Sequence, residues 1–306
     1  MADLASTIAS TFGLGTPRAV APAPGGLSND LWRLETSAGT FAVKVMRVNA
    51  TSAGFSDNIE AAHVIEANAF EQGVLCPEPV PLDDGRCLAE VDGSLARVHR
   101  WCDGRAPRPS DWLGRAGGLL AQIHSVGGSF DQPLDDEPWD AAGWASLADH
   151  ADMPGDLASR LRQAAPDLAA LESVTAATGL ITEHAMSHGD LDPKNTLVVE
   201  DTLMALDWDA ARAQPVIREA VSVALDWTTD VEGFRRVLSA YCRATGARLA
   251  DEMWPFGGWV SALGGWLVYN ATARIDTALG REQVSHACDR LLALHGSLDA
   301  YRKALS

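Results

Sequence analysis

The sequence predicts an α+β fold with two lobes: a small β-rich N-terminal lobe at residues 1–101 and a larger, mostly helical C-terminal lobe at residues 102–306. Two observations predict this division. With 306 residues, the chain is longer than one ordinary hydrophobic core needs. Short alternating apolar runs with turn residues between them end near Trp101, and apolar residues at helical spacing dominate after it.

The N-terminal lobe is expected to contain one main helix, one short helix and two β-hairpins. Its strands show residues of alternating character joined by Gly-containing turns, and its helices show apolar residues three or four positions apart. In chain order we expect a helix at 4–14, strands at 30–35 and 40–46, the main helix at 57–72, and strands at 86–91 and 94–101.

The C-terminal lobe is expected to be helical apart from short strands around residues 196–207. Helical spacing predicts helices at 111–125 and 218–227. The uncharged stretch at 256–273 is as long as a short membrane span, but it contains four glycines together with Ser, Asn and Thr. It therefore predicts a buried helix instead of a transmembrane one.

The composition excludes several classes of partner. A hydrophobic fraction of 47% with 21% charged residues is typical of a globular protein. The net charge of −17 argues against nucleic acid or an anionic membrane as the main partner, because both repel such a surface. The five cysteines are scattered without a Cys-x-x-Cys pair, and the chain start lacks the basic region of a signal peptide. We therefore expect reduced thiols and a cytoplasmic location.

The polar residues of greatest chemical interest lie in the segment His-Gly-Asp-Leu-Asp-Pro-Lys-Asn at residues 188–195, and at Asp207 beyond it. A carboxylate can accept the proton of an acceptor hydroxyl, and carboxylate and amide oxygens are ligands for Mg²⁺. We expect Asp190 to be the catalytic base and Asn195 and Asp207 to hold Mg²⁺. Each could be an ordinary turn residue, but their joint spacing favours the chemistry of phosphoryl transfer.

This pattern resembles the aminoglycoside phosphotransferase and choline kinase-like family, which shares the bilobal protein-kinase-like fold. The resemblance covers nearly the whole chain, because the elements occur in the family's order. It implies ATP or GTP as co-substrate, Mg²⁺ as cofactor and a small hydroxylated molecule as acceptor. The chain departs from the commonest family wording at Asp192, where a His is frequent, and at Lys194, where a Gly is frequent.

Lys44 lies in the run Phe-Ala-Val-Lys-Val, close to the Val-Ala-Ile-Lys pattern of kinase strand three. Alternation places Ala42 and Lys44 on one face, where Ala leaves room for adenine and Lys reaches the α- and β-phosphates. A surface Lys on an edge strand is the alternative. The Lys should pair with a Glu of the next helix. We expect Glu66, which falls on the apolar stripe of that helix, and Glu60 remains the other candidate.

A glycine-rich loop precedes the first predicted hairpin. Within it, Gly26, Ser28 and Asn29 resemble the family's nucleotide-positioning loop, whose backbone amides can cradle phosphate oxygens. The linker at residues 99–102 is expected to contact the adenine edge through main-chain groups.

Three further residues have roles that the sequence leaves open. His188 is expected to support the loop, and a role as general base is a second interpretation. Asp209 either supports the metal site or caps the following segment. Lys194 either reaches the transferred phosphate or is solvated.

The acceptor is expected to be a small molecule. Asp207 leads almost directly into the helix at 218–227, so the long activation segment of protein kinases is missing. Acidic clusters and four Trp of the C-terminal lobe would suit a cationic acceptor, or they are solvated faces and core. A nucleotide-binding pseudokinase is the alternative function, although intact base, metal and Lys positions argue against it. The acceptor, the choice between ATP and GTP, and the oligomeric state stay open.

Overall fold

The computed structural model describes residues 2–24, 29–47 and 50–305, so the loop residues Gly26 and Ser28 lie outside the described part. The chain forms two compact units. Unit 1 comprises Met1–Arg115, Leu119–Gly128 and Met186–Ala213, and unit 2 comprises Ala116–Gly118, Ser129–Ala185 and Gln214–Ser306. The predicted lobe boundary near residue 101 stays a prediction.

Unit 1 is built on a six-stranded sheet with the strand order β1-β2-β3-β6-β4, in which β5 also pairs with β6. The predicted hairpins are confirmed as the antiparallel pairs β2–β3 and β5–β6. Strand β1 was not predicted. It carries a proline at each end, which is tolerated because β1 pairs on one side only, with β2. The strands are β1 Pro17–Pro22, β2 Asn29–Thr36, β3 Gly39–Met46, β4 Pro79–Val80, β5 Ala89–Val91 and β6 Ser94–Arg100.

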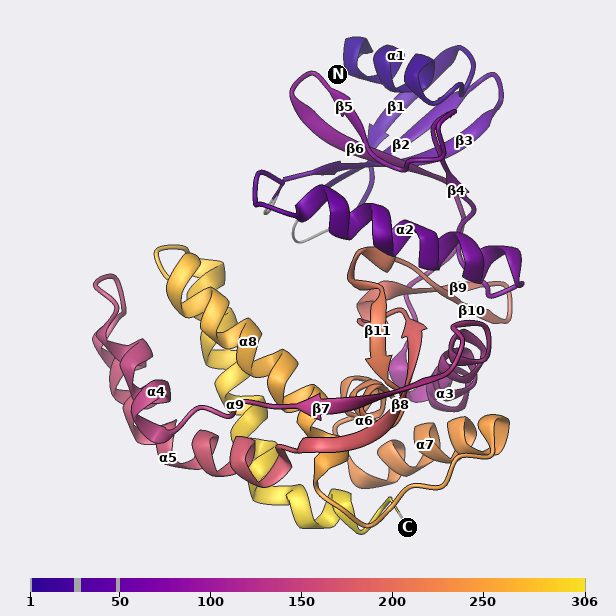
Figure 1. Ribbon diagram of the computed structural model, residues 1–306. Helices are drawn as coiled ribbons and strands as arrows, with labels where there is room; N and C mark the ends of the chain where they lie inside the picture. The colour runs from indigo at the N-terminus through magenta and orange to yellow at the C-terminus, as the bar shows by residue number, and fades with distance from the viewer. Residues whose placement is uncertain (1, 25–28, 48–49, 306) are drawn as a thin grey trace. The chain divides into compact units, whose positions relative to one another are not determined.

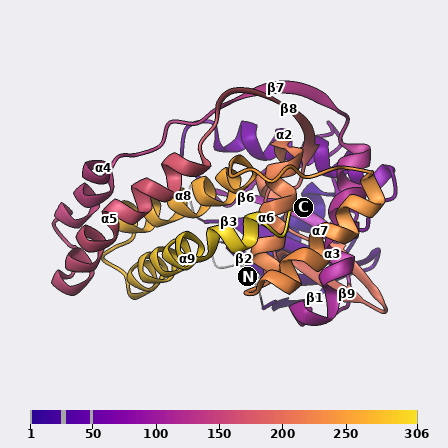
Figure 2. The same cartoon turned by 90° about the horizontal axis from the view of Figure 1, so that it is seen from below.

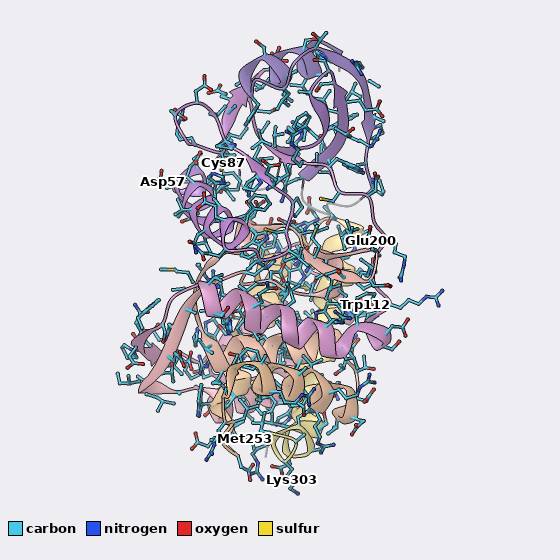
Figure 3. The ribbon with its side chains drawn as sticks, turned by 90° about the vertical axis from the view of Figure 1, so that its right-hand side faces the viewer. Asp57, Cys87, Trp112, Glu200, Met253 and Lys303 are labelled. Carbon is cyan, nitrogen blue, oxygen red and sulfur yellow. The ribbon has the colours of Figure 1, made fainter. Side chains whose placement is uncertain are left out.

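Two helices lie on opposite faces of this sheet (Figure 1). Helix α1, Ala2–Thr11, packs Ile8 and Ala9 against Leu34, Val43 and other buried residues of one face. Helix α2, Phe55–Glu71, packs against the rest of the sheet through Ile59, which contacts Met46 and Cys87. Figure 3 shows Cys87 close to the Asp57 end of α2. Val43 and Val45 face α1, so alternation places Lys44 on the opposite face, the one on which α2 packs.

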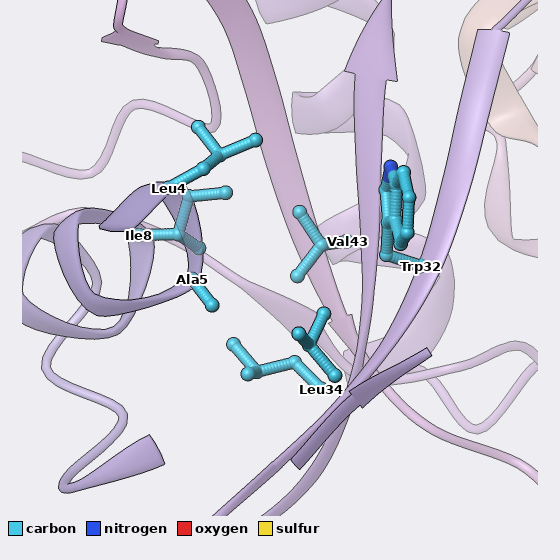
Figure 4. A pocket seen from close by; sticks show the side chains of 7 residues that line it. Leu4, Ala5, Ile8, Trp32, Leu34 and Val43 are labelled. Carbon is cyan, nitrogen blue, oxygen red and sulfur yellow. The ribbon is translucent and has the colours of Figure 1, made fainter. Parts of the chain in front are cut away.

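A small apolar pocket remains between α1 and the sheet (Figure 4). Its volume is about 10 Å³, which is about the space that one water molecule requires. This pocket is therefore a gap in the packing that is too small to bind a ligand. Its lining consists of Leu4, Ala5, Ile8, Val20, Trp32, Leu34 and Val43.

The rest of unit 1 comes from segments much later in the chain. Helix α3, Pro109–Val126, lies mostly in unit 1, and strands β9, Thr196–Val199, and β10, Thr202–Ala205, form an antiparallel hairpin. The hairpin turns at Glu200, which adopts a positive φ of 52° (Figure 3).

Unit 2 is mostly helical, as expected. Helices α5, α8 and α9 run side by side (Figures 1 and 2). The uncharged stretch forms α8, whose residues Trp259 and Leu267 are buried, so the prediction of a buried helix is confirmed. Within the described residues, no helix is long and apolar enough to span a membrane. The helices are α4 Ala141–Ser146, α5 Gly155–Thr175, α6 Val216–Trp227, α7 Val231–Thr245, α8 Gly257–Ala273 and α9 Ala278–Arg302.

A three-stranded sheet with the order β11-β8-β7 was missed by the sequence analysis. Strands β7, Phe130–Asp135, and β8, Thr178–Ser187, expose most of their residues, so they lack the alternation that marks a half-buried strand. Strand β11 spans Arg212–Pro215. The last two residues of β8 belong to unit 1, and they lead directly into His188.

Candidate active site

The β9–β10 hairpin brings Asn195 and Asp207 together. Thr196 pairs with Ala205, the last residue of β10, and Leu206, which follows it, donates its backbone N–H to the Asn195 carbonyl at 2.8 Å. Asp207 follows directly, with φ of 60° in the left-handed region. This conformation is costly for residues with a side chain, although Asp tolerates it better than most. Such strain is often found at functional positions.

The loop before β9 connects Asp190 to Asn195. The Asn195 amide nitrogen donates to the Asp190 side-chain Oδ2 at 2.7 Å and to its backbone carbonyl at 2.9 Å. Asp192 accepts from the backbone N–H groups of Lys194 at 2.8 Å and Asn195 at 3.1 Å. Asp192 thus caps the single 3₁₀ turn that presents Asn195. The Lys194 ammonium lies 3.3 Å from Asp190 Oδ2 and also pairs with Asp192, so it is not simply solvated.

His188 connects the loop at residues 190–195 to the segment that follows β10. It is fully buried, and its Nδ1 accepts from the Asp190 N–H at 3.3 Å. Its Nε2 therefore carries the hydrogen that is donated to the Leu206 carbonyl at 2.8 Å. The ring also packs on Trp208, with ring centroids 4.7 Å apart. These contacts join the loop to the segment after β10, which agrees with the structural interpretation.

Lys44 contacts the segment that follows β10. Its Nζ donates to Asp207 Oδ1 at 2.6 Å and to Asp209 Oδ2 at 2.5 Å, and its side chain is 13% exposed. Burial disfavours the ammonium, but Asp207 and Asp209 outweigh this effect and raise the pKa of Lys44. The anionic partner that an inward-facing Lys needs is thus supplied by two carboxylates.

The expected ion pair between Lys44 and Glu66 is absent from the described contacts and requires correction. Glu66 does face inward, with a side chain only 1% exposed, but it pairs with Arg97 and lies 2.9 Å from the His99 ring. Arg97 is the direct cross-strand neighbour of Lys44 and has the longer, forked side chain. The other candidate, Glu60, accepts instead from the backbone N–H groups of Cys87 and Leu88.

Arg97 is the site residue that sequence reasoning missed. Its guanidinium is 2% exposed and donates to Asp209 Oδ1 at 2.6 Å as well as to Glu66. The signal was present in the run Leu-Ala-Arg-Val-His of β6. Alternation puts Ala96 and Val98 on the α1 face, so Arg97 and His99 must point the other way.

The nucleotide-positioning loop is described only at its end. Asn29 is the first residue of β2 and accepts from the Arg47 backbone N–H at 3.0 Å. The loop does lie between two strands, β1 and β2, as the resemblance implies.

The oxygen ligands present fit a magnesium ion. Asn195 turns its amide nitrogen toward Asp190, which leaves the amide oxygen as the group that would bind a cation. Asp207 offers a carboxylate that is 41% exposed. Within residues 2–24, 29–47 and 50–305, no group of three or more His, Cys, Asp or Glu side chains could hold a metal. A site with only two protein ligands is sufficient for Mg²⁺, because this ion keeps several water and phosphate oxygens as its other ligands.

The Asp190 carboxylate is suited to proton transfer. Partial burial raises the pKa of Asp190 above its usual value, and the Lys194 ammonium offsets part of this effect. A raised pKa makes a carboxylate a better base.

Comparison with known proteins identifies the family. The sequence matches the phosphotransferase enzyme family over residues 19–256. The chain belongs to this family. The expected enzyme class, a small-molecule kinase, is thereby confirmed, and the family implies ATP as co-substrate together with a divalent metal ion.

One sequence relative and two solved structures are similar to this chain. The homoserine kinase of Rhodopseudomonas palustris (strain TIE-1) is 26% identical over 238 residues, which cover 74% of this chain and 71% of that protein. Spectinomycin phosphotransferase, solved with ADP and spectinomycin, has a TM-score of 0.61 at 10% identity and covers 95% of this chain and 97% of its own. Amicoumacin kinase, solved with AMP-PNP and Ca²⁺, has a TM-score of 0.60 at 13% identity and covers 93% and 92%. These structures confirm the α+β, protein-kinase-like fold.

Proposed function

We propose that this phosphotransferase transfers the γ-phosphate of ATP or GTP to a hydroxyl of a small molecule, with Asp190 as the base. The observation that carries the proposal is the hydrogen bond from Asn195 to Asp190, combined with the backbone bond that brings Asn195 beside Asp207. These bonds hold a base and two oxygen ligands in one network. Phosphoryl transfer needs little more from the protein than such positioning and charge stabilisation.

Each residue would have a separate task. Asp190 would orient the acceptor hydroxyl and accept its proton. Asn195 and Asp207 would hold Mg²⁺, which supplies positive charge to the phosphate oxygens. Lys44, a buried ammonium between two carboxylates, would bind the α- and β-phosphates.

For the acceptor we propose a small hydroxy amino acid of the homoserine kind. The support is the homoserine kinase relative, which aligns along most of both chains. An aminoglycoside-like antibiotic is the second candidate, supported by the fold shared with spectinomycin phosphotransferase.

The test is a phosphotransfer screen with Mg-ATP and Mg-GTP over homoserine, amino alcohols, sugars and aminoglycosides. We expect ADP or GDP formation that depends on one acceptor class and stops when the metal is chelated. Nucleotide binding without transfer to any acceptor would favour the pseudokinase and contradict the proposal.

Replacing Asp190 should separate chemistry from binding. We expect Asp190→Ala to lower kcat by about 10²- to 10⁴-fold, the usual contribution of a positioned base, and to leave the Mg-ATP affinity nearly unchanged. The matched control is Asp201→Ala, an exposed Asp at the turn of the same β9–β10 hairpin. Steady-state kinetics and calorimetric titration measure the two quantities. Normal turnover by Asp190→Ala would refute the assignment of the base.

A further inference from the structure

Two cations lie side by side on the face of the unit 1 sheet that packs against α2. Lys44 on β3 and Arg97 on β6 are directly paired residues of neighbouring antiparallel strands, so their side chains leave the sheet on the same face. Like charges placed directly opposite each other are destabilising. Something must lie between them, and here it is the Asp209 carboxylate.

Asp209 bridges the two cations with separate oxygens. Its Oδ1 accepts from Arg97 at 2.6 Å and its Oδ2 accepts from Lys44 at 2.5 Å. Its side chain is 20% exposed, so its charge needs these partners. Because each oxygen accepts from a different cation, Asp209 has little freedom to turn.

The Arg97 guanidinium is also held by a second carboxylate. Its second terminal nitrogen donates to Glu66 of α2, and both side chains are almost completely buried, at 2% and 1% exposed. A guanidinium can serve two carboxylates at once because its donors form a rigid fork, whereas an ammonium acts as a point charge. The chain of contacts runs from α2 through Glu66, Arg97 and Asp209 to Lys44.

We propose that Arg97 is a positioning residue of the phosphoryl-transfer site, which fixes Asp209 and thereby sets where the Lys44 ammonium lies. Glu66 pairs with Arg97. Among the described contacts, Lys44 is therefore connected to α2 only through Asp209, Arg97 and Glu66. Lys44 keeps Asp209 as a partner even when Asp207 is engaged elsewhere. This role rests on the proposed function, because it assumes that Lys44 binds nucleotide phosphates.

The test is a double-mutant cycle in a background in which Arg97→Met leaves no buried carboxylate without its cation. Arg97→Met alone would leave Glu66 buried without its cation and could prevent folding. Glu66→Gln is therefore the background, and Arg97→Met and Asp209→Asn are added to it singly and together. The measured quantities are the Kd for Mg-ATP by calorimetry, the KM for ATP, kcat and Tm.

We expect each substitution to weaken Mg-ATP binding about 10-fold and the pair to weaken it by about the same factor, because both break one bridge. The KM for ATP should rise in parallel, with a smaller change in kcat. Independent effects that multiply to about 100-fold, or an Arg97 substitution that lowers only Tm, would overturn the proposal.

Arg218→Met is the matched control. Arg218 is a buried arginine of α6 in unit 2 that donates to Asp136 at 2.8 Å, so its loss should lower Tm without changing the Kd for Mg-ATP. Binding by the wild-type protein without phosphotransfer would refute the proposed function and leave the cycle informative. A wild-type protein that binds no Mg-ATP would refute both.

Discussion

Glu66 shows how one buried carboxylate can stay charged in a low-dielectric setting. Burial on its own would raise its pKa, but the Arg97 guanidinium and the nearby His99 ring outweigh this and lower the pKa of Glu66 to about 2. The pairing leaves little of the carboxylate unsatisfied, since each oxygen has a partner. A carboxylate with a depressed pKa stabilises the folded state only where it is ionised.

This depression predicts a steep acid limb in the stability of the protein. The contribution of Glu66 is fully present above the unfolded-state pKa of about 4.5 and is lost as the pH falls through about 2. The shift corresponds to a loss of about 3 kcal/mol across that window. Denaturant unfolding at several pH values measures it. Glu66→Gln should be less stable at neutral pH and should depend less on pH between about 4.5 and 2.

The exposed Glu90 on β5 provides the control, because Glu90→Gln removes the same acid without a buried partner. Its stability curve should run parallel to that of the wild-type protein. The interpretation of Glu66 would be wrong if the Glu66→Gln curve also ran parallel to the wild-type curve.

At the scale of elements, the segment from Asp190 to Asn195 is held by its own side chains. Asp192 lies where the family often has His, and the structure shows what its side chain contacts. It caps the 3₁₀ turn through two backbone N–H groups and pairs with Lys194. The two residues that depart from the common family motif therefore contact each other, and Lys194 also lies 3.3 Å from Asp190.

We predict that Asp192→Ala lowers both stability and turnover. Loss of a capping side chain costs about 1 kcal/mol, and here it also loosens the backbone that presents Asn195. Asp192→Asn should retain most of the cap and lose only the ion pair with Lys194. Tm and kcat, measured for both variants, distinguish the two effects.

Asp140→Ala is the comparison variant. Asp140 caps α4 in unit 2 by accepting from the Gly143 backbone N–H at 2.8 Å, so the same chemistry is removed away from the loop. It should lower stability by a similar amount and leave kcat unchanged. If Asp192→Ala also changed only stability, the cap would have no part in presenting Asn195.

The elements also show what local sequence patterns can predict. The β2–β3 and β5–β6 hairpins were predictable because alternation and turn residues lie within a few positions of each other. Strands β7 and β8 were not, since their exposed residues carry no alternation. The inward direction of Glu66 followed from its helix stripe. Its partner did not, because Arg97 and Lys44 are both cationic, and the register that places them directly opposite each other joins strands that are far apart in the sequence.

For the molecule as a whole, the residues proposed to bind nucleotide and metal come from distant parts of the sequence and meet in one compact unit. Lys44 and Asp207 are 163 positions apart, yet they are hydrogen bonded within unit 1. Asp190, Asn195 and Glu66 belong to the same unit. Unit 2 contributes the helices α4–α9 and most of the β7–β8 pair, with its own buried ion pair between Arg218 and Asp136.

This division predicts where nucleotide binding will slow amide hydrogen exchange. Mg-ATP should protect β3, α2 and the segment from His188 to Asp209, because ligand binding suppresses local opening of the elements that hold it. Helices α5 and α9 of unit 2 should exchange at unchanged rates. ATP with a chelator is the control, and it should give weaker protection of the segment around Asn195 and Asp207. Protection confined to α5 and α9 would place the nucleotide elsewhere and contradict the site assembled in unit 1.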